Sequence, residues 1–161
     1  MINRYGSLAI FLLIAVLAAF ASAAFEAGSW YHHALQKPAW TPPAWLLAVA
    51  WALAYLFAVG AAWQAWLTEH VDRVKAVVVW VVLLGLNVAW SYVYLAAHRP
   101  GKSSLLLGVA LALTVYCVSV LRRINPAAAL LMLPYLLWIA FNWLLNLATW
   151  TLSGGILSRF L

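Results

Sequence analysis

Residues 30–45 read WYHHALQKPAWTPPAW, and this stretch is the longest interruption in an otherwise apolar sequence. It contains three of the six prolines and three of the eleven tryptophans. Proline lacks the N–H that a helix needs and disfavours helical geometry in the preceding residue, so no membrane helix can run through this stretch. Because three tryptophans are costly to leave in water, we predict an ordered cap on a bundle of helices.

The rest of the chain has the composition of an integral membrane protein. Of its 161 residues, 68% are hydrophobic and 7% are charged, whereas a soluble domain has about 25% charged residues. The chain has nine Lys and Arg residues but only three Asp and Glu residues. These charges stand singly or in pairs between the apolar runs. This pattern suits anionic lipid headgroups and not nucleic acid. Cys117 is the only cysteine, so an intrachain disulfide and a cysteine zinc site are excluded.

Five apolar runs, each long enough to cross a bilayer, predict an all-α, multi-pass integral membrane protein. We expect one domain over residues 1–161, folded as a five-transmembrane-helix bundle with a structured first loop. The predicted spans are residues 8–25, 44–67, 76–97, 103–121 and 127–152. An odd number of spans places the two termini on opposite sides, and the Lys and Arg counts favour a cytoplasmic N-terminus only slightly.

The first run also fits a signal peptide, with Arg4 ahead of an apolar core and Ala21-Ser22-Ala23 as the cleavage site. Its length, close to that of a spanning helix, favours the membrane span. In the fifth run, Pro134 is expected to kink the helix mildly.

The predicted spans contain no Asp, Glu, Lys or Arg, although pumps and proton-coupled carriers usually keep such a residue in the membrane. No carboxylate pair and no Ser/His/Asp arrangement is present, so we predict no catalytic residues. The histidines lack a metal-ligand spacing, so we predict no metal site. These histidines are His32, His33, His70 and His98.

Three asparagines fall inside the spans, where an amide needs hydrogen-bonding partners. Asn87 lies near the middle of the third span, Asn142 near the middle of the fifth, and Asn146 one turn later. They are either links between helices, worth about 1 kcal/mol or less each, or polar contacts in a ligand pocket, and the two roles are compatible. The helical period places them on two polar stripes, which are Asn87/Ser91/Tyr94 and Trp138/Asn142/Asn146.

Four tryptophans lie well inside their spans, away from the interfacial belt where this residue usually gathers. Tyr55 lies one helical turn after Trp51, which is one of the four. Aromatic rings that point into a bundle make flat walls for a planar apolar ligand, although ordinary core packing explains them as well. The four are Trp51, Trp90, Trp138 and Trp143.

Taken together, these residues resemble the translocator protein / tryptophan-rich sensory protein (TspO/MBR) family. The first-loop signature is Trp30-Tyr31-x-x-Leu35-x-Lys37-Pro38-x-Trp40-x-Pro42-Pro43, followed by Trp51 and Tyr55. The third-helix motif is Asn87-x-x-Trp90-Ser91, and the fifth is Pro134-Tyr135-x-x-Trp138-x-x-Phe141 with Asn146. The resemblance covers nearly the whole chain.

The resemblance implies a bundle, usually dimeric, that binds porphyrins such as protoporphyrin IX and haem in a pocket under the first loop. It implies a receptor or carrier in tetrapyrrole transport, sensing or stress regulation, with the porphyrin as ligand and no required cofactor. Benzodiazepine- or isoquinoline-type ligands and sterols also bind to members of the family. Lipids and a second copy of the chain are the other expected partners. Gly85 and Ala89, four residues apart, are one candidate for the dimer contact.

The resemblance and the two polar stripes define the candidate site. The predicted ligand-binding residues are Trp51, Tyr55, Asn87, Trp90, Ser91, Trp138, Phe141 and Asn142. The predicted lid or mouth residues are Trp30, Tyr31, Lys37, Pro38, Trp40, Pro42 and Pro43.

Two departures from the family bear on ligand preference. Asn142 stands where the family has a small alanine, and Trp143 follows, so we expect a smaller pocket or an added hydrogen bond. The family's sterol motif needs a tyrosine before a basic residue, and residues 152–159 contain no tyrosine. We therefore predict no strong sterol function.

Two alternative functions remain. The first is an enzyme that breaks down porphyrin with light or oxygen, using tryptophans as redox partners, which needs no acid–base pair. The second is a structural or signalling membrane scaffold, which predicts no cavity beneath the loop.

Overall fold

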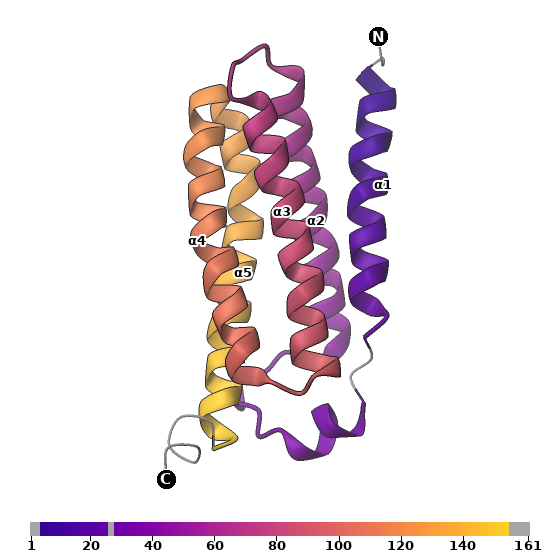
Figure 1. Cartoon of the computed structure of the whole chain (residues 1–161), viewed down its shortest axis with the longest axis vertical. Coiled ribbons are helices and arrows are strands. Elements are labelled where there is room, and N and C mark those ends of the chain that lie inside the picture. The colour runs from indigo at the N-terminus through magenta and orange to yellow at the C-terminus, as the bar shows by residue number, and fades with distance from the viewer. Residues whose placement is uncertain (1–3, 26–27, 155–161) are drawn as a thin grey trace.

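The computed structural model describes residues 4–25 and 28–154, and within these ranges it is helical, with no strand. Five helices cross the length of the molecule (Figure 1). They are α1 (Arg4–Ala23), α2 (Ala44–Leu67), α3 (Arg73–Ser91), α4 (Pro100–Ile124) and α5 (Pro126–Leu152). Two π-helical turns accompany them, η1 (Trp30–Ala34) in the first loop and η2 (Tyr92–Ala96) at the end of α3. The all-α fold predicted from the sequence is confirmed.

All five helices are long and apolar enough to cross a membrane, counting η2 with α3. The protein is therefore an integral, multi-pass membrane protein. The predicted span 44–67 coincides with α2, whereas α4 begins at Pro100 and ends at Ile124, three residues beyond the prediction at each end. Proline is tolerated in the first helical turn, and Arg122 and Arg123 are favourable in the last turn, next to the negative end of the helix dipole.

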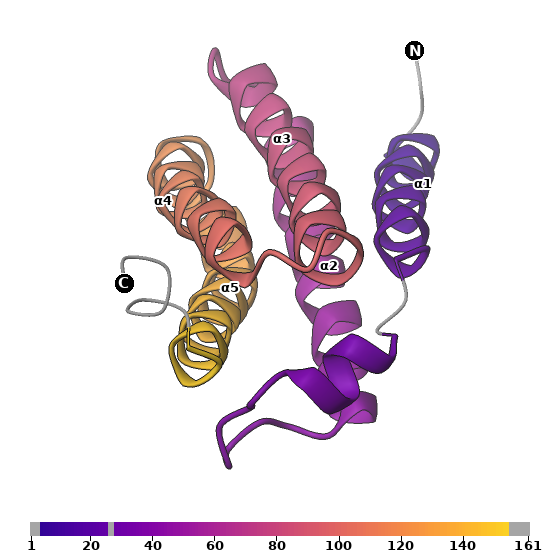
Figure 2. The same ribbon diagram turned by 60° about the horizontal axis from the view of Figure 1, so that its bottom comes forward.

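The helices form a closed ring in the order α1, α2, α5, α4, α3, with α2 and α3 also in contact across it. α1 lies at one edge of the bundle, where it packs against α2 and α3 (Figures 1 and 2). The loop from α1 to α2 folds across the same end of the bundle as the α3–α4 connection and the end of α5. This arrangement places the first loop directly over the helix ends.

The centre of the bundle is packed by small residues on α2 and by large ones on its neighbours. The buried face of α2 includes Ala58, Ala61 and Ala65, each no more than 1% exposed. Small side chains let neighbouring helices approach closely, which is the main source of packing energy between helices in lipid. Trp80 of α3 and Tyr135 of α5 are the largest of the fully buried side chains.

α4 and α5 pack closely because two glycines of α4 lie under two tryptophan rings of α5. A Cβ atom built on Gly101 would stand 2.8 Å from Cε2 of Trp150, and one on Gly108 would stand 3.3 Å from Nε1 of Trp143. Trp143 is thus turned toward α4. Its indole uses the space that the missing side chain of Gly108 leaves.

Candidate ligand-binding site

The first loop is fixed to the bundle by its first tryptophan. The ring of Trp30 stacks on the imidazole of His98, with centroids 4.4 Å apart, and meets the ring of Tyr94 edge-on at 6.2 Å. His98 has a φ of 55°, in the left-handed region, at the end of the turn that follows η2. Leu35, five residues after Trp30, is buried. The structured first loop predicted from the sequence is confirmed.

The second half of the loop is attached to α5. The backbone N–H of Gln36 donates to Oγ of Ser153 at 3.1 Å, and the ring of Trp40 meets Phe141 edge-on at 5.9 Å. Trp40 lies in a turn that is closed by Thr41, whose backbone N–H and hydroxyl both donate to the carbonyl of Pro38. The loop therefore spans the bundle from the α3–α4 connection to α5.

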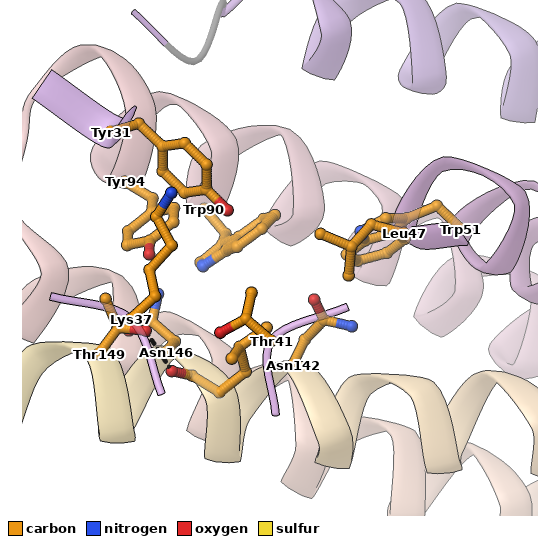
Figure 3. Close-up of a pocket in the computed structure, with 11 residues that line it drawn as sticks. Tyr31, Lys37, Thr41, Leu47, Trp51, Trp90, Tyr94, Asn142, Asn146 and Thr149 are labelled. Atoms are coloured by element: carbon orange, nitrogen blue, oxygen red, sulfur yellow. Dashed lines mark hydrogen bonds between the residues drawn. The ribbon is translucent and has the colours of Figure 1, made fainter. Parts of the chain in front are cut away.

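A small cavity of about 70 Å³ lies beneath this loop (Figure 3). It has room for a few water molecules or one small polar group. The loop contributes Tyr31, Lys37 and Thr41, and the helices contribute Leu47, Trp51, Trp90, Tyr94, Asn142, Leu145, Asn146 and Thr149. We call this space the loop cavity.

The polar side chains that α5 presents to the loop cavity use their donors within the protein. Asn142 donates from Nδ2 to the carbonyl of Trp138 at 2.8 Å, and Asn146 donates from Nδ2 to Oγ of Ser103 at 3.0 Å. The hydroxyl of Thr149 donates to the carbonyl of Leu145, one turn earlier. Asn146 is thus a link between α4 and α5, as one of the two interpretations of the sequence predicts, whereas Asn142 bonds within its own helix.

Lys37 is the charged residue of the loop cavity. Its Nζ lies 3.9 Å from the centroid of the Tyr31 ring, an arrangement in which the π-electrons attract the cation. Burial raises the pKa of the Tyr31 hydroxyl above its usual range. The Tyr31 hydroxyl is therefore neutral at physiological pH and adds no negative charge beside Lys37.

A second, larger cavity of about 490 Å³ lies between α1, α2 and α3. This volume falls within the range of roughly 300–1,000 Å³ that is typical of small-molecule sites. The lining residues are Ala19, Ser22, Ala23 and Phe25, then Ala48, Trp51, Ala52 and Tyr55, then Asn87, Trp90, Ser91 and Leu95. We call it the helix cavity. Alanines on the facing sides of α1 and α2 leave the space open.

Aromatic rings form one wall of the helix cavity. Trp51 and Trp90 line both cavities, and their ring centroids are 5.8 Å apart at an interplanar angle of 31°. Trp51 also meets Tyr55 edge-on at 5.7 Å, and Trp90 stacks on Tyr94 at 5.6 Å. Flat, polarizable surfaces of this kind bind planar apolar molecules well.

Two buried polar atoms on residues of the helix cavity have no hydrogen-bonding partner within the described chain. They are Oδ1 of Asn87 and Nε1 of Trp90, and Trp90 lines the loop cavity as well. Oγ of Ser22 lies within hydrogen-bonding reach of the Tyr55 hydroxyl. The other end of the Asn87 amide is satisfied, because Nδ2 donates to the hydroxyl of Tyr135 at 2.7 Å. Leaving a buried polar atom unpaired costs about 1–3 kcal/mol, so such atoms indicate a missing partner.

The structure brings together five of the eight predicted ligand-binding residues around the helix cavity and leaves three outside it. Asn142 lines the loop cavity instead. Trp138 and Phe141 stack on each other with centroids 5.2 Å apart and line neither cavity, although Trp138 meets Trp51 edge-on at 5.9 Å. The five are Trp51, Tyr55, Asn87, Trp90 and Ser91.

The predicted lid residues have two separate roles. Tyr31 and Lys37 line the loop cavity, whereas Trp30 and Trp40 fix the loop to the bundle. The three prolines of the lid line neither cavity, and Pro43 stands immediately before α2 as its N-cap. The loop therefore covers the small cavity, and its residues 28–43 do not line the large one.

One expectation about the pocket differs from what the structure shows. Trp143 does not narrow either cavity, because its indole packs over Gly108 on α4. The contribution of α1 to the helix cavity was missed, since no residue of the first span was predicted to bind the ligand. The signal that could have identified it is the alanine spacing of Ala19 and Ala23, beside the polar Ser22, near the end of the first span.

The fold and the site define a multi-pass membrane protein with an aromatic cavity inside its helix bundle and a loop fixed over one end. The model of the TspO/MBR family matches residues 8–151, and the chain belongs to this family. The family predicted from the sequence motifs is thus confirmed.

Curated relatives match over most of their length. The chain is 35% identical over 155 residues to the translocator protein of Homo sapiens, covering 90% of this chain and 89% of the relative. It is 34% identical over 146 residues to the tryptophan-rich protein TspO of Archaeoglobus fulgidus, covering 88% and 94%. It is 32% identical over 150 residues to the protein CrtK of Rhodobacter capsulatus, covering 91% and 92%.

Proposed function

We propose that this protein is a membrane receptor or carrier that binds planar tetrapyrroles, such as protoporphyrin IX or haem, in the helix cavity. The observation that carries the proposal is the cavity itself, about 490 Å³ in volume, with Trp51, Tyr55 and Trp90 on its wall and unpaired polar atoms beside them. Binding would serve tetrapyrrole transport, sensing or stress regulation in the membrane.

The chemistry of the wall fits a planar ring with a polar centre. The indoles of Trp51 and Trp90 supply apolar area for the face of a macrocycle. Oδ1 of Asn87 is an acceptor without a partner and suits a polar hydrogen of the ligand. Asn87 is only 2% exposed, so its oxygen has little access to bulk water. A ligand that pairs with it removes the desolvation cost.

A pure scaffold role explains these features less well. A scaffold gains nothing from an open cavity, since each void in a bundle forfeits packing contacts. Membership of a family that includes proteins named translocator protein also supports a ligand-related role.

Filling the helix cavity tests the proposal. Ala52 lines the cavity, so the variant Ala52→Phe places a ring in it, whereas Ala112→Phe adds the same ring to an exposed face of α4. We expect Ala52→Phe to weaken protoporphyrin IX binding at least about tenfold and Ala112→Phe to leave it unchanged, measured by quenching of tryptophan fluorescence in nanodiscs. Equal affinity in both variants and the wild type would rule out the helix cavity as the site.

Light- or oxygen-dependent breakdown of the bound porphyrin is the second candidate function. It is favoured by the contacts of Trp51 with Trp90 and Trp138, which place three oxidisable indoles in one connected group beside the cavity. Illumination of the complex in the presence of dioxygen would test it. Protein-dependent loss of the porphyrin absorption band with a defined product supports the activity, and equal bleaching with Trp51→Phe opposes it.

A further inference from the structure

The loop cavity has donors without acceptors, and this imbalance points to an anionic occupant. Nε1 of Trp90 has no hydrogen-bonding partner within the described residues. Nζ of Lys37 rests against the face of the Tyr31 ring. This ring contact provides no oxygen acceptor for the three N–H groups of the lysine. Figure 3 shows the amino group of Lys37 beside the Tyr31 ring, and Lys37, Trp90 and Tyr94 all line this cavity.

Among the residues that the structure describes, the charges at this end of the molecule have the same sign. Lys37, Arg99 and Lys102 all lie at the end covered by the first loop, and Glu69 and Asp72 lie at the opposite end. Asp72 is already paired there with Lys75, at 2.6 Å. Within residues 4–25 and 28–154, therefore, no carboxylate lies at this end beside Lys37, and Glu26 falls outside these ranges. The described charges at this end attract anions.

The two cavities share a wall of two indole rings. Trp51 and Trp90 line both, so a ring held against these indoles in the helix cavity has one edge near the loop cavity. The loop cavity, at about 70 Å³, is too small for a macrocycle but suits a carboxylate group. Tetrapyrroles such as protoporphyrin IX carry their carboxylates on short side chains along one edge of the ring.

We propose that the loop cavity is a carboxylate-binding subsite, in which Lys37 pairs with an acidic side chain of the ligand. This inference rests on the proposed function, because the ring of that ligand occupies the helix cavity. Lys37 then selects ligands with a free carboxylate over their neutral esters. The first loop carries this selectivity, and the helices bind the ring.

Two ligands and three variants test the subsite. Protoporphyrin IX and its dimethyl ester share one ring and differ in charge, so their affinities are compared in nanodiscs of neutral lipid. The variants are Lys37→Met, which removes the charge, Lys37→Arg, which keeps it, and Lys102→Met. Lys102 is an exposed lysine at the same end of the bundle that lines neither cavity.

We expect the wild type to bind the acid about tenfold more tightly than the ester, because only the acid can form a charge-assisted pair with Lys37. Lys37→Met should lose this preference by weaker binding of the acid, with the ester unchanged, which also shows that the variant is folded. Lys37→Arg and Lys102→Met should keep it. A preference that survives Lys37→Met overturns the subsite.

The two proposals fail in distinguishable ways. If the wild type binds acid and ester equally, the subsite is overturned and the proposed ring site stands. If it binds neither ligand, both are overturned.

Discussion

The indole rings of Trp51 and Trp90, with centroids 5.8 Å apart, form part of the wall of both cavities. Trp51 comes from α2 and Trp90 from α3, so their separation depends on how these two helices pack. A change at either ring therefore acts on the helix cavity and on the loop cavity together. This pair is where we expect binding to be most sensitive to substitution.

Trp51→Ala should weaken protoporphyrin IX binding more than Trp138→Ala. Trp51 lines both cavities, whereas Trp138 lines neither and acts through its edge-on contact with Trp51. We expect a loss of tenfold or more for Trp51→Ala and a smaller one for Trp138→Ala, measured by displacement of bound porphyrin. Equal losses would mean that Trp138 contacts the ligand directly.

The Asn87–Tyr135 hydrogen bond should contribute measurable stability inside the membrane. Tyr135→Phe removes the acceptor of Asn87 Nδ2 at a buried position. Interhelical hydrogen bonds in membranes average about 0.6 kcal/mol and reach about 1.7 kcal/mol in double-mutant cycles. We expect a coupling free energy in this range between Tyr135→Phe and Asn87→Ala, from unfolding in mixed detergent micelles. A coupling of zero would show that the bond makes no net contribution.

Trp30→Ala should release the first loop. The indole loses its stack on His98 and its contact with Tyr94, which fix the start of the loop to the α3–α4 connection. We expect faster hydrogen exchange of the backbone amides between residues 35 and 41, and a faster dissociation of porphyrin. Trp45→Ala is the matched control, because Trp45 is 67% exposed at the start of α2. An unchanged exchange rate in Trp30→Ala would show that other contacts hold the loop.

Gly101→Ala should destabilise the bundle, because the new Cβ would stand 2.8 Å from the Trp150 ring. Overpacking of this kind typically costs about 1–3 kcal/mol. Gly60→Ala is the control, since a Cβ at that position would make only an ordinary contact, 3.6 Å from Cδ1 of Leu131. Thermal unfolding in detergent should show a lower midpoint for Gly101→Ala and no loss for Gly60→Ala. A stable Gly101→Ala variant would mean that the Trp150 ring can move aside.

A homodimer through Gly85 and Ala89 remains our proposal for the assembly of the chain. Gly85 is exposed on α3, with open space around it, so its surface is free for a second copy. Gly85→Leu should convert a dimer into a monomer without unfolding it, measured by light scattering in detergent. A dimer that persists in Gly85→Leu would place the interface elsewhere.

The spans and the loop could be predicted because each depends on local chemistry. The apolar length of residues 44–67 suffices to define α2, and the prolines at 38, 42 and 43 end any helix before it. The grouping of Asn87, Trp90 and Ser91 could also be predicted, since the helical period places them on neighbouring faces. The boundaries of α4 were less predictable, because charged residues at helix ends resemble loop residues in a sequence.

The sequence by itself determined the five membrane spans, the capping loop and the motif residues, because hydrophobic length, proline geometry and helical period act within one segment. Only the tertiary structure decided that Trp51 and Trp90 lie between two cavities, that Trp138 packs behind them, and that Trp143 faces Gly108. The helical period fixes which residues of a helix share a face, but the neighbour that meets this face follows from packing. The helix cavity exists because alanines of α1 and α2 face each other across it, and their small side chains do not fill the space.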